Sequence, residues 1–570
     1  MPAEFQVTGR NASAPFKLRL HRGDGMLLIA MNWHSGRPPD DFVGFGIQYR
    51  EPSGDRFFDL KNRLGFLDPD GEIDPRKLST MLSPIQKFRW VHFPRNAELP
   101  GEFLYRVTPV FMNGLGELSY GIPQEAAIEL RRETYPGQLN VTFTRGFVSS
   151  QAFVDKYGSA GPISTLLPPS SDDGLTFTPT HPKADEALKW MGFEARHAIL
   201  EVLDQALTDG ADVFVAAYDL SERDVVSKLE ALGPRLKILI DDDGNHGEPH
   251  SGESQAEVRL VASAGRANVR RQHMGKLQHN KLVVVDGPNV KRAVCGSTNF
   301  SWRGFFVQAN NAVIVQGPTA IAPFKAAFDA YWASDDAGDF GKTASADWAD
   351  LGLSGIKAKV AFSPHSAKNA LLAKIADDIE NGTTSCLFYS LAFLFQTPGV
   401  ILDAIKAVTA DDDIFVYGIS DKKVGGLELQ KPDGNLAPVR PSVLAKNVPP
   451  PFSEEPVGGG GNRMHHKFVV IDFDKPTARV YLGSYNFSKP ADRTNGENLL
   501  LIQDRRIVTS YTVEALRIFD HYHFRVVQQE AKAAKRKLAL RRPPSAAGET
   551  PWFDGDYTVP RKIRDRELFA

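Results

Sequence analysis

The chain has 570 residues, which is enough for several domains with separate hydrophobic cores. Its 67 Lys and Arg residues nearly balance its 69 Asp and Glu residues, so it lacks the positive field of a dedicated nucleic-acid-binding protein. It shows neither a secretory signal pattern nor an apolar run long enough to cross a bilayer, so we expect a cytoplasmic protein. Secretion without such a signal stays an open alternative.

The first part of the chain, residues 1–135, has the pattern of a small all-β sandwich. Short alternating segments, as at 43–50 and 103–111, are separated by Gly, Pro, Asn and Asp. Residues 99–110 resemble the tyrosine-bearing strand of fibronectin type III domains, and residues 46–50 resemble an earlier strand of that fold. Such domains usually act as spacers or docking modules, so we expect a structural role here, with a protein partner as the alternative.

The rest of the chain has an α/β pattern that occurs twice. Helix, strand, helix and strand are predicted at about 184–208, 213–218, 224–232 and 236–241, and again at about 367–380, 386–391, 400–408 and 414–417. This repetition predicts an internal duplication. The expected parts are connecting strands and a linker at 136–183, a first lobe at 184–345, a second lobe at 346–530 and a basic C-terminal tail at 531–570. An insertion at about 420–462 is expected to be a mobile loop, either a lid or a surface excursion.

Each copy carries the same set of polar residues around an apolar strand. The first set is His279, Lys281, Asp286, Ser297 and Asn299, and the second is His465, Lys467, Asp472, Ser484 and Asn486. Residues two apart on a strand face the same way, so each histidine should project beside its lysine. Chance repetition of the whole set at nearly equal spacing would be rare, although any one of these residues alone is more often structural than catalytic.

This set meets the needs of phosphodiester cleavage. Lysine ammonium and asparagine amide groups can neutralise and bind the phosphate oxygens without a metal. One imidazole can attack phosphorus while the other donates a proton to the leaving oxygen. The two histidines must then titrate unequally, which predicts a bell-shaped pH dependence.

The repeated residues resemble the duplicated HKD signature of the phospholipase D superfamily, which includes phospholipases, phosphatidyltransferases and nucleases. The resemblance covers about residues 184–528. It implies two α/β lobes related by a pseudo-twofold axis, with both motifs at their interface and no metal or other cofactor. It also implies that His279 is the nucleophile and His465 the general acid. Phosphate and substrate contacts are expected from Lys281, Lys467, Ser297, Asn299, Ser484 and Asn486.

Supporting roles are expected for several further residues. Asp286 and Asp472 complete the two motifs and are expected to support the site rather than to touch phosphate. Glu497 and, at the matching offset, Asn310 are expected to orient the histidines, one with a carboxylate and the other with an amide. His466 faces away from His465 on a regular strand, so a structural role is expected for it. A zinc site at His273, His279, His465 and His466 is disfavoured because the lysines would repel the ion.

Three functions are open at this point. We favour hydrolysis or transfer of the headgroup phosphate ester of phospholipids at a membrane surface, through a phosphohistidine. The alternative is an endonuclease of the same superfamily acting on DNA or RNA. A non-catalytic binding scaffold is less favoured because every polar member of both motifs is present. The sequence is compatible with a monomer.

Overall fold

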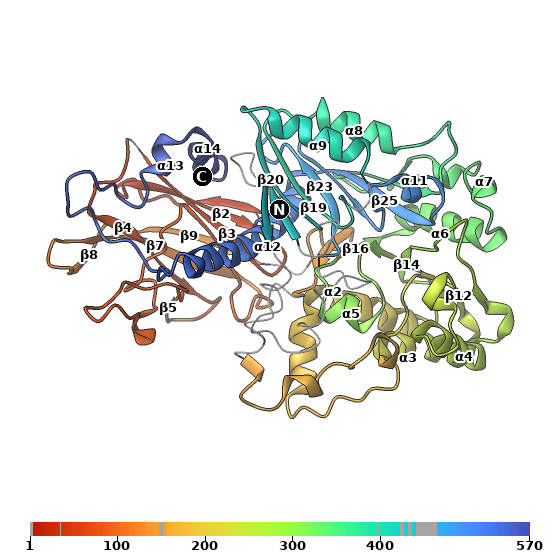
Figure 1. Cartoon of the computed structure of the whole chain (residues 1–570). Coiled ribbons are helices and arrows are strands. Elements are labelled where there is room, and N and C mark those ends of the chain that lie inside the picture. The colour runs from red at the N-terminus through yellow and green to blue at the C-terminus, as the bar shows by residue number, and fades with distance from the viewer. Residues whose placement is uncertain are drawn as a thin grey trace. The chain divides into compact units, whose positions relative to one another are not determined.

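The computed structural model of the chain describes residues 4–34, 36–130, 133–146, 153, 156–395, 398–421, 427–430, 436–439 and 464–570. It divides into two compact units (Figure 1). The sandwich unit contains Met1–Arg132 and Thr509–Ala570, and the two-lobe unit contains Glu133–Gln430 and Leu436–Val508.

The sandwich unit has two antiparallel sheets, which confirms the expected all-β region. One sheet contains β1 (Gln6–Thr8), β2 (Phe16–Arg22), β3 (Leu27–Trp33) and β6 (Arg89–His92). The other contains β5 (Phe58–Asp59), β4 (Phe42–Arg50), β7 (Glu102–Met112), β8 (Leu118–Tyr120) and β9 (Gln124–Glu129), with β9 paired to β7. Alternate residues of these strands point into one core that includes Phe16, Phe45 and Tyr105, as the two-residue period of a strand requires.

The C-terminal segment packs against this same core. It contains most of α12 (Arg505–Ala533), α13 (Gly555–Thr558) and α14 (Pro560–Leu568). Phe553 is fully buried among the sandwich residues, and Arg89 of β6 donates to Asp520 and Asp565 at 2.7 and 2.9 Å. Residues 531–570 are therefore part of the sandwich unit and not a free tail.

The first lobe is built on a mixed sheet. In spatial order it contains β10 (Leu139–Phe143), β16 (Asn311–Gln316), β15 (Lys291–Gly296), β14 (Lys281–Asp286), β11 (Asp212–Ala217), β12 (Leu236–Ile240) and β13 (Val269–Arg271). Its helices are α2 (Ala184–Asp209), α3 (Arg223–Leu232), α4 (Gly252–Ala264), α5 (Trp302–Phe306), α6 (Pro318–Ala333) and α7 (Ala337–Phe340). Strand β10 lies in the stretch that was expected to be a connection, but it pairs with β16 and forms one edge of this sheet.

The second lobe repeats this arrangement. Its sheet order is β17 (Ala349–Asp350), β18 (Lys357–Ser363), β25 (Glu497–Gln503), β24 (Arg479–Gly483), β23 (Lys467–Ile471), β19 (Cys386–Leu391), β20 (Phe415–Asp421), β21 (Leu427–Gln430) and β22 (Leu436–Val439). Its helices are α8 (Leu372–Glu380), α9 (Val400–Ala410) and α11 (Lys489–Arg493). The run from β18 to β20 matches the run from β10 to β12 strand for strand, which confirms the duplicated α/β fold.

Two expected elements differ in extent from the prediction. Helix α8 begins at Leu372 rather than near 367, because Asp492 accepts hydrogen bonds from the Leu371 N–H, at 3.0 Å, and through its backbone oxygen from the His365 N–H. The first part of the expected insertion forms the paired strands β21 and β22. The remainder, with the proline and glycine runs at 449–451 and 458–461, lies outside the described residues.

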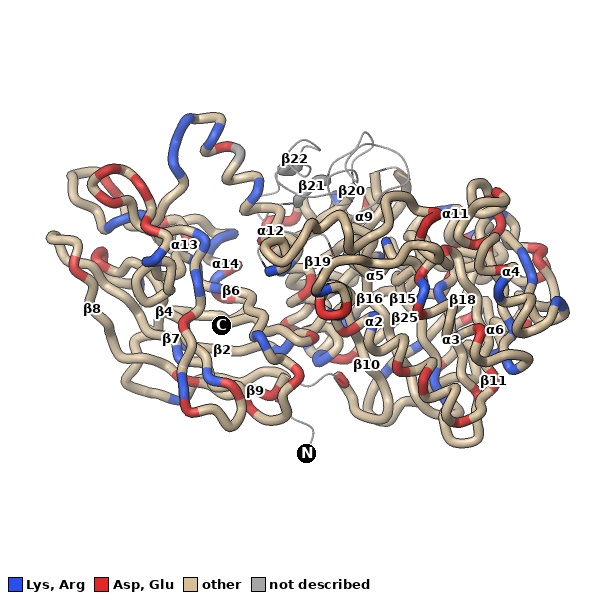
Figure 2. The backbone as a smooth tube through the Cα atoms, turned by 90° about the horizontal axis from the view of Figure 1, so that it is seen from below, with Lys and Arg blue, Asp and Glu red and all other residues tan. Residues whose placement is uncertain are grey.

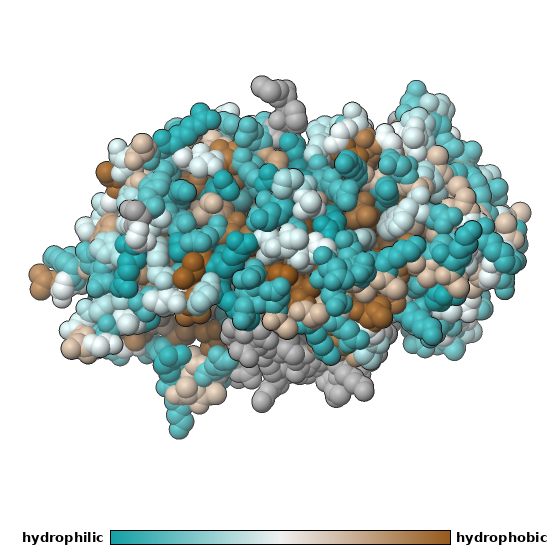
Figure 3. Space-filling view, turned by 90° about the horizontal axis from the view of Figure 1, so that it is seen from above, coloured by the Kyte–Doolittle hydropathy of each residue, from teal (hydrophilic) through white to brown (hydrophobic). Residues whose placement is uncertain are grey.

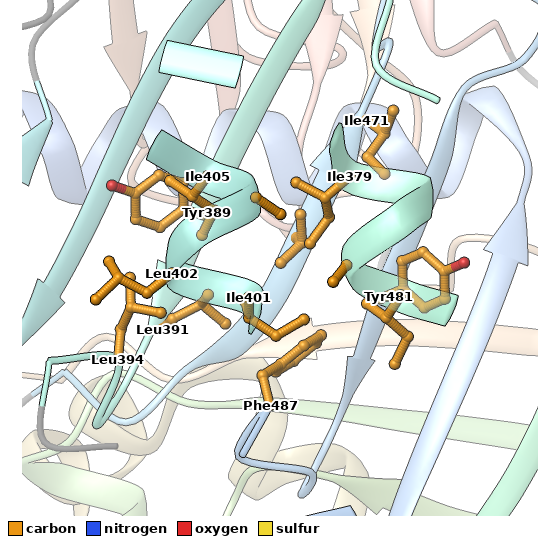
Figure 4. Close-up of a cluster of buried hydrophobic side chains, with 14 of the residues drawn as sticks. Ile379, Tyr389, Leu391, Leu394, Ile401, Leu402, Ile405, Ile471, Tyr481 and Phe487 are labelled. Atoms are coloured by element: carbon orange, nitrogen blue, oxygen red, sulfur yellow. The ribbon is translucent and has the colours of Figure 1, made fainter. Parts of the chain in front are cut away.

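A hydrophobic core joins the helices of the second lobe to its sheet. Ile379 of α8 and Ile401, Leu402 and Ile405 of α9 pack over strand residues such as Tyr389 (Figure 4). This core holds β19 and β23 in place. These strands lead into the site described next.

The charged residues and the hydropathy of the surface agree with the composition. Lys and Arg are interspersed with Asp and Glu along the chain (Figure 2), and the face shown in Figure 3 is mainly hydrophilic with small apolar areas. Among the described residues, no helix combines the length and the apolar character needed to cross a bilayer.

Candidate active site

The two motif histidines meet between the lobes. His279 lies two residues before β14 begins at Lys281, and His465 lies two residues before β23 begins at Lys467. Their ring centroids are 6.5 Å apart and both side chains are buried. The structure therefore brings together two imidazoles that are 186 positions apart in sequence, since 465 − 279 = 186.

Each histidine is held by a residue of the other lobe. Glu497 of β25 accepts a hydrogen bond from His279 Nδ1 at 2.7 Å. Asn310, which precedes β16, accepts through Oδ1 from His465 Nδ1 at 2.8 Å, and the Ser297 carbonyl oxygen lies 3.2 Å from the same nitrogen. Both contacts place Nδ1 against an acceptor, which leaves Nε2 of each ring to face a substrate.

The two serines support these orienting residues. Ser297 Oγ donates to Asn310 Oδ1 at 3.0 Å. Ser484 forms a side-chain hydrogen bond with Glu497, and its Oγ accepts from the Asn498 N–H at 3.0 Å. Both serines are fully buried. Their hydroxyls are thus engaged behind the histidines, and the substrate contact expected of them stays a prediction.

A further pair of contacts crosses between the lobes beside the histidines. Asn498 donates to the Asn280 side chain at 3.0 Å, and the Asn311 amide lies 3.3 Å from His466 Nδ1. His466 is buried and its ring lies edge-on to Phe143. It has the structural environment that the strand geometry predicted.

The two lysines lie beside the histidines and are almost fully buried. Lys281 donates to the backbone oxygen of His279 at 2.6 Å, and Lys467 donates to that of His465 at 2.8 Å. Their ammonium groups repel one another, and each has further N–H groups that can bind phosphate oxygens.

Burial and the two ammonium groups shift the titration of the whole site. Burial, with the charge of Lys281, lowers the pKa of His279 well below its ordinary value, and burial with Lys467 does the same to the pKa of His465. Burial lowers the pKa of Lys281 to about 8, although Glu497 opposes the shift. Burial raises the pKa of Glu497 to about 8, and Lys281 opposes that shift. A phosphate between the lysines would add the negative charge that this site lacks.

The two aspartates of the motifs lie at the other ends of their strands, and the structure does not bring them to the histidines. Asp286 pairs with Lys291 on β15. Asp472 is fully buried and accepts from the N–H groups of Thr384 and Ser385, each at 2.8 Å, where β19 begins. Asp472 therefore anchors the backbone at the far end of its strand, and neither aspartate acts beside the histidines.

A polar cluster in the first lobe has no counterpart in the repeated motifs. Tyr218 and Asp219 follow β11, Asp241 follows β12, and His246 lies in the loop after it. The Tyr218 ring centroid is 4.6 Å from that of His279 and 4.7 Å from Lys281 Nζ. The available signal was that β11 and β12 are neighbouring parallel strands, whose carboxyl ends commonly carry functional residues.

His246 lies between two carboxylates of this cluster. Its Nε2 is 3.1 Å from Asp219 and its Nδ1 is 2.9 Å from Asp241. Burial lowers the pKa of His246, but the two carboxylates outweigh burial and raise it to about 10. The ring is therefore an imidazolium at neutral pH.

Asn299 is fixed by the same cluster, whereas its counterpart in the second lobe is not. Asn299 Nδ2 donates to Asp219, and its buried Oδ1 has no hydrogen-bond partner among the described residues. Asn486 Oδ1 also has no such partner, but no carboxylate fixes the orientation of that amide.

One group of described residues has a geometry that could hold a metal ion. Asp219, His246 and Glu253 each offer one ligand atom within 4.8 Å of the others. Asp219 and His246 are already paired with one another, and Glu253 accepts from the Leu220 N–H at 2.8 Å. His273, considered above for zinc, is exposed and pairs with Asp242.

Comparison with known proteins places this geometry in a family. Residues 199–332 and 375–519 match the family described as "Cardiolipin synthase, PLD-like domain". Over 47 residues the chain is 45% identical to a phospholipase D of Rickettsia prowazekii, which is 8% of this chain and 21% of the relative. Over 59 residues it is 42% identical to a mitochondrial cardiolipin hydrolase of Xenopus tropicalis, which is 10% of this chain and 26% of the relative.

A solved phosphatidylserine synthase of Haemophilus influenzae is 13% identical, with a TM-score of 0.42, over 60% of this chain and 92% of that one. The chain spans only about a fifth to a quarter of the length of the two curated relatives described above.

Proposed function

Because the chain belongs to the phospholipase D superfamily, we propose that it is a phosphodiesterase that cleaves the headgroup phosphate ester of phospholipids through a phosphohistidine. The observation that carries the proposal is the pair of buried histidines, 6.5 Å apart, each oriented by the opposite lobe. Lys281 and Lys467 flank the pair and supply the positive charge that a phosphodiester needs.

His279 is the nucleophile in this proposal. Glu497 accepts its Nδ1–H, so the lone pair of the ring lies on Nε2, where it can attack phosphorus. The low pKa of His279 keeps this ring neutral near pH 7. Nε2 forms a bond to phosphorus while the bond from phosphorus to the leaving oxygen breaks.

His465 is the general acid. Asn310 accepts its Nδ1–H through a neutral amide oxygen, which stabilises an imidazolium less than a carboxylate would. The negative charge of bound substrate raises the pKa of His465, so its Nε2 carries a proton that passes to the leaving oxygen. Water, or an alcohol in the transfer reaction, then gives its proton to His465 and attacks the phosphohistidine, which frees His279.

Two observations favour lipid over nucleic acid. The relatives reported above are named a phospholipase D and a cardiolipin hydrolase. The net charge of −2, with the charges interspersed, is also unlike a nucleic-acid-binding surface (Figure 2).

The proposal is tested by incubating the purified protein, with EDTA present, with mixed phospholipids and ethanol, and separately with single- and double-stranded DNA. We expect phosphatidic acid and phosphatidylethanol from the wild type. We expect a loss of about a thousandfold or more for His279→Ala and His465→Ala, because each removes a group that acts in bond making or breaking. His197→Ala changes an exposed first-lobe histidine of α2 and serves as the matched control.

Quenching during turnover in an alkaline denaturant, in which the phosphorus–nitrogen bond survives, should trap the phosphorus of the substrate on His279 and not on His465. DNA cleavage with intact lipid would replace the lipid proposal with a nuclease. Lipid cleavage that survives both histidine changes would overturn the mechanism.

A further inference from the structure

The residues that follow β11 in the first lobe and β19 in the second lobe form two opposite walls of the site. These walls differ at equivalent positions. Strand pairing places Ala217 opposite Lys281 and Leu391 opposite Lys467. Two residues further along each strand end are Asp219 in the first lobe and Phe393 in the second. The Phe393 ring centroid lies 6.0 Å from Lys467 Nζ. A carboxylate on one wall thus replaces a phenyl ring on the other.

The first-lobe wall carries a carboxylate that is partly open to solvent. Asp219 and Asp241 hold the single positive charge of His246 between them, and the charges of Lys281 and Arg303 also act on Asp219. The Asp219 side chain is 25% exposed, while Asp241 is fully buried. Asp219 is therefore the member of this cluster that can meet a ligand.

Asp219 repels a phosphate that lies against it, so a substituent of the substrate that meets Asp219 needs positive charge or hydrogen-bond donors.

A second observation comes from the orientation of Asn299. Its Nδ2 donates to Asp219, so its amide cannot turn over without losing that bond, and no described residue donates to its buried Oδ1. Asn299 is 2% exposed. A buried acceptor of this kind is costly unless a donor reaches it. Asp219 and Asn299 thus offer two acceptors to one ligand.

A primary ammonium has the complementary chemistry, since it carries positive charge and three N–H donors and accepts nothing. A quaternary ammonium has no N–H to donate, and an uncharged hydroxyl lacks the charge. We propose that Asp219 and Asn299 form a subsite for a primary ammonium group on one substituent of the phosphodiester. This inference rests on the proposed function and adds the headgroup class: an ethanolamine-type ester.

The test compares short-chain phosphatidylethanolamine with phosphatidylglycerol of the same acyl chains, both below their micelle concentrations and with EDTA present. The readout is the ratio of their kcat/KM values, because a general loss of activity cancels in it. We expect the wild type to prefer the ethanolamine ester, and Asp219→Asn to lower the ratio by about ten- to hundredfold. Asp219→Glu should restore part of the ratio. Asp329→Asn, an exposed carboxylate change on α6, should leave it unchanged.

A competition measurement needs no variant. Against wild-type turnover of bis(4-nitrophenyl) phosphate, phosphoethanolamine should inhibit about tenfold more strongly than phosphocholine, which carries the same positive charge without N–H donors.

The possible failures are distinct. Absence of turnover of every phosphodiester would remove the proposed function itself. Turnover with equal use of both headgroups, or a ratio that Asp219→Asn leaves unchanged, would overturn only the ammonium subsite. A preference of the wild type for the ethanolamine ester that needs added divalent metal and is lost with EDTA would also overturn the ammonium subsite. It would indicate a metal at Asp219, His246 and Glu253 instead.

Discussion

The two buried lysines link the electrostatics of the site to a measurable pH dependence. The Lys281 ammonium must be protonated to bind phosphate, and burial lowers its pKa to about 8. In the free enzyme kcat/KM should therefore fall as the pH rises through about 8. Lys467, whose pKa is lowered well below its ordinary value by burial and by Lys281, shares the pocket, so the observed limb belongs to the coupled pair.

Lys281→Arg should shift this alkaline limb to higher pH, because a guanidinium stays protonated where an ammonium does not. The readout is the pH at which kcat/KM falls to half of its maximum. The maximum itself is not used, since the altered geometry of the arginine will lower it as well. Lys325→Arg on α6, which pairs with Asp329, is the matched control and should leave the limb in place. An unmoved limb in Lys281→Arg would assign it to another group, with Lys467 the next candidate.

At the residue scale, motif repetition predicted which side chains would gather but not how they would be connected. His279, Lys281, His465 and Lys467 were identified from spacing alone, and Glu497 and Asn310 were expected to orient histidines. The structure pairs Glu497 with His279 and Asn310 with His465. This pairing depends on how the two lobes pack together, which no local sequence pattern encodes. Asp219 and His246 were missed because only one lobe carries them, so repetition gave no signal.

At the scale of the elements, the two motif aspartates occupy equivalent strand ends but have unequal structural roles. Asp472→Ala would leave the N–H groups of Thr384 and of buried Ser385 without this acceptor at the start of β19. We expect the two-lobe unit to lose about 3 kcal/mol of stability, since each buried group left unpaired costs roughly 1–3 kcal/mol. Asp286→Ala removes only a partly exposed pair with Lys291 and should cost about 0.5 kcal/mol or less.

Thermal unfolding and amide hydrogen exchange of β19 would measure the difference between these variants. Asp472→Asn keeps one acceptor oxygen and should retain much of the stability. Equal effects of Asp286→Ala and Asp472→Ala would contradict the assigned roles.

Helices and buried strands were largely predictable because their residues carry the signal locally. The predicted helix at about 184–208 corresponds to α2, and the predicted strand at 386–391 to β19. Edge strands were less predictable. β10 belongs to the first sheet only through its pairing with β16, a contact between residues far apart in sequence.

At the scale of the whole molecule, the sequence shows a sandwich at one end and a tail at the other, whereas the structure joins the two ends in one unit. Aromatic residues from the two ends of the chain pack against one another and join them. The Phe553 ring lies 5.9 Å from that of Phe42, and Trp552 Nε1 donates to the Phe42 backbone oxygen at 3.0 Å. Neither Trp552 nor Phe553 belongs to a periodic segment, so the sequence offers no signal for this packing.

The packing of the two chain ends in the sandwich unit can be tested separately from catalysis. Phe553→Ala empties a fully buried ring position and should cost the sandwich unit about 3–5 kcal/mol. Because the described site residues all belong to the two-lobe unit, kcat/KM at low temperature should stay within about twofold of the wild type while the sandwich unit unfolds at lower temperature. Leu115→Ala, at a side chain that is 85% exposed, is the matched control and should change neither property. Calorimetry that resolves two transitions would show the Phe553 effect in one of them; a parallel loss of kcat/KM would mean instead that the sandwich unit contributes to the site.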